Sequence, residues 1–157
     1  MRVRQYVYFS LRSDYIPADE ITARLGMEAD EIRVKASKRV NPPLPRCHAW
    51  NVVCRDGGLT VDEQIDRVID RLQPLTDQIA ALAREIDASE GESAAATLQV
   101  VRYLNDDDGE EESPQPDGTD LVRLPGQHQL LGWYLDRRIL EFLHHTGAEL
   151  DVDEYGY

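Results

Sequence analysis

The sequence lacks most of the features that place a protein in a class at once. Its 157 residues hold only two cysteines, and no apolar run reaches the length of about 20 residues that spans a bilayer. The N-terminal MRVRQYVYFS has no apolar stretch of the kind found in a secretory signal. These absences predict a cytoplasmic protein with reduced thiols and no membrane partner.

Motifs for catalysis and for cofactor binding are also missing. The chain has no G-x-S-x-G, no glycine-rich nucleotide loop and no twelve-residue calcium loop. Cys47 and Cys54 are seven apart and would face opposite ways on one regular strand, and His144 and His145 lack the i, i+4 spacing of a helical metal pair. We therefore predict no cofactor and no metal. A non-enzymatic protein is favoured, and an enzyme of unknown type stays open because distant residues can assemble a site.

Positive charge is scarce. The chain has 17 basic and 30 acidic residues, which gives a formal net charge of −13. Such a field repels nucleic acid and acidic lipid, and it attracts a basic protein. Solubility or adaptation to a salty cytoplasm is an equal alternative explanation.

What the chain does contain is a series of strand and helix patterns. The segment YVYFSLRS (residues 6–13) alternates with period two, which predicts a strand with one apolar and one polar face. The apolar face carries Val7, Phe9 and Leu11, and the polar face carries Tyr6, Tyr8 and Arg12.

Several helices have readable ends. A helix over 17–26 begins at Pro17 and stops at Gly26. Thr60-Val-Asp-Glu63 has the spacing of a capping box, and Pro74 is expected to kink or break the helix that follows. A capped helix is predicted over 136–147, and further strands over 31–36, 48–55, 96–104, 128–135 and 149–155.

The predicted order is β-α-β-β-α-β followed by β-α-β. The first six elements have the order of a ferredoxin-like split unit, so we predict an α+β fold with an antiparallel sheet and helices on one face. One domain over 1–157 is expected: a βαββαβ core (1–104), an acidic flexible loop (105–120) and a C-terminal βαβ extension (121–157). Three prolines between residues 42 and 45 are expected to exclude a strand ladder there.

The most unusual local feature is a basic loop (residues 33–46). It holds both lysines of the chain and three arginines, with no acid. Aromatic strand residues stack bases on the open sheets of RNA-binding domains, so this loop and the sheet tyrosines form a candidate surface for nucleic acid or a small ligand. The net charge disfavours nucleic acid, and a solvated polar loop is the plain alternative. The surface comprises Tyr6, Tyr8, Arg12, Arg33, Lys35, Lys38, Arg39, Arg46 and Trp50.

The second candidate surface is acidic. Residues 105–120, NDDDGEEESPQPDGTD, hold eight acids and no base, and the closing strand adds more. Their carboxylates would pair with Lys and Arg of a basic protein partner. The basic loop and acidic block of two copies would equally form a homodimer, or pair within one chain. The candidate partner-binding residues are Asp106, Asp107, Asp108, Glu110, Glu111, Glu112, Asp151, Asp153 and Glu154.

Five segments together resemble a known bacterial family: Y-x-Y-F-S-L-R-S, P-A-D-E-I-T-A-R-L-G, the A-W strand, D-E-Q-I and the closing G-A-E-L-D-V-D-E-Y. They are similar to the domain-of-unknown-function 4279 family over most of the chain. The matching residues form strands and helix ends, and none is a catalytic signature. The resemblance implies no activity. Relatives look like immunity proteins of bacterial toxin systems, which implies a binding role, so we predict an immunity-like inhibitor of a basic protein.

Overall fold

Strand β1 (Arg2–Ser13) lies at the centre of the sheet. The computed structural model describes residues 1–91, 93–112 and 128–156. β1 pairs antiparallel with β3 (His48–Cys54) on one side and with β4 (Ala96–Leu104) on the other. The short strand β2 (Glu31–Arg33) lies beyond β3, and β6 (Glu149–Gly156) lies beyond β4.

The six-stranded sheet therefore has the order β2-β3-β1-β4-β6, with β5 (Glu110–Glu111) paired to the start of β1. The expected antiparallel sheet is corrected at one edge, because β6 runs parallel to β4 and makes the sheet mixed. The chain travels from β4 to β6 through a helix, and a helical crossover returns the chain in the same direction.

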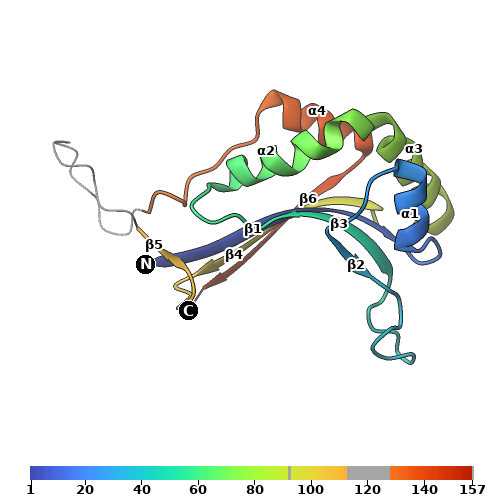
Figure 1. Cartoon of the computed structure of the whole chain (residues 1–157), viewed down its shortest axis with the longest axis horizontal. Coiled ribbons are helices and arrows are strands. Elements are labelled where there is room, and N and C mark those ends of the chain that lie inside the picture. The colour runs from blue at the N-terminus through green and yellow to red at the C-terminus, as the bar shows by residue number, and fades with distance from the viewer. Residues whose placement is uncertain (92, 113–127, 157) are drawn as a thin grey trace.

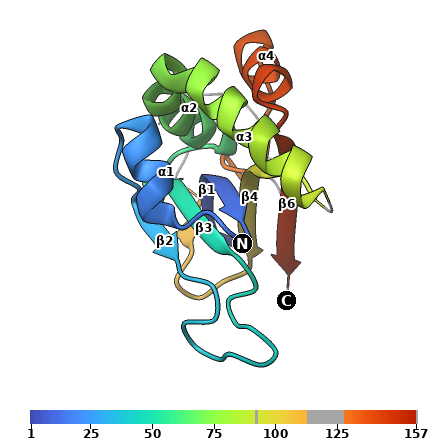
Figure 2. The same ribbon diagram turned by 90° about the vertical axis from the view of Figure 1, so that its right-hand side faces the viewer.

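The helices cover one face of the sheet (Figure 1). They are α1 (Ala18–Leu25), α2 (Val61–Leu72), α3 (Thr76–Glu90) and α4 (Arg137–Thr146). A 3-10 turn, Gln73–Leu75, carries Pro74 between α2 and α3, so the predicted break at this proline is confirmed. Figure 2 shows the chain between β2 and β3 extending away from the helices, on the other side of the sheet.

The core lies between the helices and the sheet, as the alternation in the first strand predicts. Val7, Phe9 and Leu11 are fully buried, and the Phe9 ring meets the ring of Phe142 on α4 at a centroid distance of 5.6 Å. Leu98 of β4 is opposite Phe9 in the ladder and is equally buried. The odd positions of β1 thus form the floor of the core.

The helix ends follow the predicted chemistry. Thr60 and Glu63 form the complete capping box at the start of α2. α1 stops at Gly26, whose φ of 68° is a left-handed conformation that suits glycine. These side-chain caps satisfy backbone groups that a helix leaves unpaired at its ends.

The strand predicted over residues 128–135 is wrong. Residues 129–130 form a turn, and residues 132–136 have no strand partner. The guanidinium of Arg102, only 4% exposed, donates to the carbonyls of Leu130 (3.2 Å) and Leu131 (3.3 Å) and pairs with Glu154 at 2.8 Å. A buried arginine thus satisfies carbonyl groups that a neighbouring strand would otherwise bind. Residues 121–127 of the predicted extension lie outside the described residues.

The acidic block is also more ordered than predicted over its first half. The Asn105 amide donates to the Arg2 carbonyl at 2.7 Å, and Glu110 and Glu111 form β5 against the start of β1. Residues 113–120 of this block lie outside the described residues.

Gly109 at the corner before β5 gives a test of this packing. An added Cβ would lie 2.9 Å from the Asp106 carbonyl oxygen and 2.9 Å from the Val3 amide nitrogen. We expect Gly109→Ala to lower the free energy of unfolding by about 2 kcal/mol, because backbone atoms on both sides would have to shift.

The matched control is Gly132→Ala, since a Cβ at Gly132 meets nothing within 4 Å. It should change stability by less than about 0.5 kcal/mol. Urea unfolding followed by tryptophan fluorescence measures both. Equal effects of the two substitutions would contradict the close packing at Gly109.

Candidate functional site

The basic loop is folded as a hairpin, and most of its residues are exposed to solvent. The Ala36 amide donates to the Pro45 carbonyl and the Lys38 amide to the Leu44 carbonyl, both at 2.9 Å. The Leu44 amide donates to the Arg39 carbonyl at 2.8 Å, which forms an isolated bridge between these two residues. As expected, this proline-containing segment forms no strand ladder, and the isolated bridge forms because Leu44 keeps its N–H group between two prolines.

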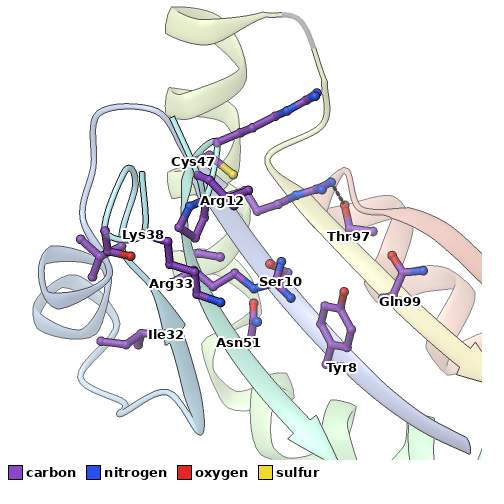
Figure 3. Close-up of a pocket in the computed structure, with 16 residues that line it drawn as sticks. Tyr8, Ser10, Arg12, Ile32, Arg33, Lys38, Cys47, Asn51, Thr97 and Gln99 are labelled. Atoms are coloured by element: carbon purple, nitrogen blue, oxygen red, sulfur yellow. Dashed lines mark hydrogen bonds between the residues drawn. The ribbon is translucent and has the colours of Figure 1, made fainter. Parts of the chain in front are cut away.

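A cavity of about 700 Å³ lies between this hairpin and the open face of the sheet (Figure 3). Its floor comes from strands: Tyr8 and Ser10 of β1, Asn51 of β3, and Thr97 and Gln99 of β4. The loop side supplies apolar and basic groups, among them Ile32, Arg33, Val34, Lys38, Leu44, Pro45, Arg46 and Cys47. The volume is in the range that small-molecule sites occupy.

The register of the sheet explains why the surface is hollow here. Ala49 of β3 is opposite Arg12 of β1 and opposite Arg33 of β2. Two arginines therefore flank a position with a methyl side chain. One step along, Asn51, Ser10 and Thr97 form a polar row across β3, β1 and β4. The cavity follows from a small residue between two long ones.

Among the described residues, four with cationic side chains line the cavity, Arg12, Arg33, Lys38 and Arg46, and no carboxylate does. Arg12 donates from Nη2 to Thr97 Oγ1 at 2.7 Å, a bond drawn in Figure 3. The side chains of the other three form no ion pair or hydrogen bond with any residue that the structure describes. Elsewhere, Arg39, Arg84 and Arg137 form no ion pair with a described residue, and eight arginines pair with acids: Arg2, Arg4, Arg24, Arg55, Arg67, Arg71, Arg102 and Arg138.

Asn51 is the floor residue with the most telling environment. Its side chain is 2% exposed, yet its Oδ1 has no hydrogen-bond partner among the described residues. A buried acceptor without a donor costs stability, commonly about 1–3 kcal/mol. Next to it, burial raises the pKa of the Tyr8 hydroxyl, and the neighbouring Arg33 acts in the opposite direction.

The structure places only some of the residues of the predicted ligand surface around the cavity. Tyr8, Arg12, Arg33, Lys38 and Arg46 line the cavity. The loop cations Lys35 and Arg39 do not. Lys35 pairs with Asp14 at 3.0 Å, and Arg39 donates from Nε to the Pro42 carbonyl at 3.1 Å.

The placement of Trp50 on this surface is wrong. Trp50 is fully buried on the helix side, where its Nε1 donates to Thr22 Oγ1 of α1 at 3.2 Å. Because side chains alternate along β3, the neighbouring Asn51 takes the position on the open face. The floor residues Asn51, Ser10, Thr97 and Gln99 were not among the residues predicted for this surface.

The ring of Tyr6 lies outside the cavity and its surroundings are already occupied. It stacks on Tyr8 with centroids 6.2 Å apart, and the Arg55 guanidinium lies 4.1 Å from its centre. Farther along the same face, Tyr103 stacks on Tyr155 at 4.9 Å. Tyrosines with such neighbours offer little open ring surface for stacking bases.

The predicted acidic surface is largely engaged within the chain. Asp106 pairs with Arg4 at 2.8 Å and Glu111 with Arg2 at 2.7 Å, and these hydrogen bonds hold the pKa of both carboxyls below their usual values. Glu110 Oε1 accepts from the Gly58 amide at 2.6 Å. These acids hold β5 and its flanks against the start of the sheet.

The remaining acidic candidates lie at two edges. The Asp107 carbonyl accepts from Arg2, and the Asp108 amide donates to Asp106, while Glu112 directly follows β5. On the edge strand β6, Asp153 accepts from Gln99 at 3.2 Å and Glu154 pairs with Arg102. Asp151 on the same strand is exposed.

The thiols and histidines are placed apart. Cys47 is half-buried beside the cavity and Cys54 lies in the core, and burial raises the pKa of both thiols. His145 contacts Asp77 at 2.9 Å on the helix side. Across the described ranges, no group of three or more His, Cys, Asp or Glu side chains is arranged to hold a metal.

The fold and this site define an α+β domain with helices on one face of a mixed sheet and a cationic cavity on the other. The chain belongs to the family described as Domain of unknown function (DUF4279), whose sequence model matches residues 3–157, essentially the whole chain. No curated protein and no solved structure matches it. Among the helices described, none is long and apolar enough to cross a membrane.

Asn51 yields a stability prediction. We expect Asn51→Leu to raise the free energy of unfolding by about 1 kcal/mol, because the substitution removes a buried acceptor that has no donor. Urea unfolding measures the change.

The matched control is Gln64→Leu. Gln64 Oε1 is also buried without a partner, but its Nε2 donates to the carbonyls of Gln5 (3.2 Å) and Asp56 (2.9 Å). This variant should therefore lose stability. A loss of similar size for Asn51→Leu would show that the Asn51 amide has a structural role.

Proposed function

We propose that this domain is a binding module for a small anionic ligand held between the open sheet face and the basic loop. One observation carries the proposal. Arg33, Lys38 and Arg46 line a cavity that no described carboxylate lines, and none of the three forms an ion pair with a described residue, in a chain of net charge −13. Because carboxylates are abundant, most of the arginines that the structure describes pair with one of them.

Electrostatics favours an anion at this place. Like charges gathered around a partly enclosed cavity repel one another, and that repulsion is relieved when a ligand brings negative charge. Arg12 is held in place by Thr97, so part of the site is arranged before a ligand arrives. A preorganised site loses less side-chain entropy on binding.

A small ligand is favoured over a nucleic acid. At physiological salt, charges separated by more than about 8 Å are largely screened, so a small anion is attracted mainly by the cavity. A polymer would extend past the cavity toward the carboxylates elsewhere on the chain. The stacked tyrosines also offer few open ring faces.

A finer description of the fold accompanies this proposal. We interpret the part from β1 to β4 as a ferredoxin-like βαββαβ unit. To this unit α4 adds one helix on the helical face, and β6 adds one strand at the edge of the sheet. The antiparallel order β2-β3-β1-β4 supports that interpretation. In this unit the sheet face opposite the helices is open, which is where the cavity lies.

The immunity-like inhibitor, the homodimer and the cytoplasmic location stay predictions. We place the cavity ahead of the acidic surface because Asp106, Glu111 and Glu154 already pair with arginines of this chain. A basic partner would have to compete with those pairs.

The test compares charge reversal at two adjacent residues. Anilinonaphthalene sulfonate, a dye with one sulfonate and an apolar ring system, serves as the probe in a fluorescence titration. We expect Lys38→Glu to weaken saturable dye binding by about 10-fold or more, which corresponds to at least about 1.4 kcal/mol.

Arg39→Glu is the matched control, because it makes the same change in net charge within the same loop but outside the cavity. It should weaken dye binding less than about 3-fold, because solvent screens the changed charge from the dye in the cavity. Equal effects of the two reversals, or no saturable binding by the wild-type chain, would refute the proposed site.

A further inference from the structure

We infer that the ligand of this cavity is a nucleotide, with its phosphates on the cations of the basic loop and its base on the polar floor. The inference rests on the proposed function and adds the ligand class. The inference follows from the different chemistry of the two ends of the cavity, the basic loop and the polar floor.

The loop end is suited to phosphate. Arg33, Lys38 and Arg46 come from β2 and from both sides of the hairpin, and all three line the same cavity. Guanidinium groups bind phosphate oxygens in pairs, and an ammonium adds a point charge. Several cations around one space match a group that carries more than one negative charge, which a single carboxylate does not.

The floor of the cavity holds a hydrogen-bond acceptor that a donor on the ligand would satisfy. Asn51 Oδ1 is buried in the row that Ser10 and Thr97 continue, and it has no donor among the described residues. An anionic group cannot satisfy this acceptor. The N–H and NH₂ groups on the edge of a nucleobase, or a ribose hydroxyl, can donate to it.

Between these ends the walls suit a flat ring. Val34 and Leu44 line the cavity from the loop side, although 48% and 45% of their surface is exposed to solvent. Tyr8 lies opposite on the sheet, as Figure 3 shows. Apolar side chains on one side and the polar groups of the floor on the other fit a base better than they fit a sugar or an inorganic ion.

The experiment is isothermal titration of the full chain with the four common ribonucleoside diphosphates, the matching nucleosides, and pyrophosphate. At least one diphosphate should bind about 10-fold or more tightly than both its nucleoside and pyrophosphate, since each of these lacks one end. Binding of all nine probes at the same affinity, or of pyrophosphate most tightly, would overturn the inference.

Two variants separate the ends. Lys38→Glu should weaken the diphosphate and pyrophosphate alike, by about 10-fold. Asn51→Leu should weaken the diphosphate by about 10-fold and leave pyrophosphate unchanged. If Asn51→Leu does not fold, Asn51→Ser replaces it, since serine shortens the acceptor. A loss of both ligands in either Asn51 variant would contradict base recognition.

The dye titration separates failure of the inference from failure of the proposed function. Dye binding that Lys38→Glu weakens, together with no nucleotide binding at millimolar concentration, leaves an anion site and rejects the nucleotide. Tight binding of single-stranded RNA with a steep salt dependence would also reject it, in favour of a polymer.

Discussion

The two-residue period of β1 is the constraint on which the molecule depends. Val7, Phe9 and Leu11 are fully buried under the helices, while Tyr8, Ser10 and Arg12 between them face the cavity. One strand therefore supplies both the centre of the core and the floor of the site. A register slip of one residue would place arginine in the core and phenylalanine in the cavity. Because the same strand carries both sets of residues, the register of the core fixes the position of the site.

Positive and negative side chains gather in different parts of this molecule, which the residue counts alone do not reveal. Part of the carboxylates pair with arginines, at the N-terminal corner, along β6 and between helices. The cavity is spared because Ala49 occupies the position between Arg12 and Arg33, where an acid would neutralise both. The result is a local positive field inside a negative molecule. Such a field attracts a small anion at short range while the whole molecule repels a large polyanion.

Much of the fold could be predicted from local sequence. The alternation of residues 6–13, the capping box at Thr60 and the break at Pro74 depend on neighbours in the chain, so they are visible without tertiary structure. The strand at 128–135 was wrong because its apolar residues resemble a strand. What decides its conformation is Arg102, which is distant in sequence and satisfies its carbonyl groups. β5 consists of two glutamates and has no strand pattern at all.

The candidate site could be predicted only in part, for a similar reason. The basic loop is obvious from composition, but which of its cations face the cavity depends on a hairpin closed by the single N–H of Leu44 among three prolines. The segment HAWNVVC is apolar at both odd and even positions, so periodicity does not say which face Trp50 takes. Pairing of Trp50 with Leu11 settles it and turns Asn51 to the open face. Long-range register is the information that a single sequence lacks.

The most direct test of the central claim, that this cavity is an anion site, is an amide NMR titration of the wild-type chain with pyrophosphate. The account predicts that the largest shift changes fall on Arg12 and on the basic-loop residues that line the cavity, with a common saturation curve. Largest changes at residues 106–112, at β6 or on the helices, or changes that do not saturate, would contradict it.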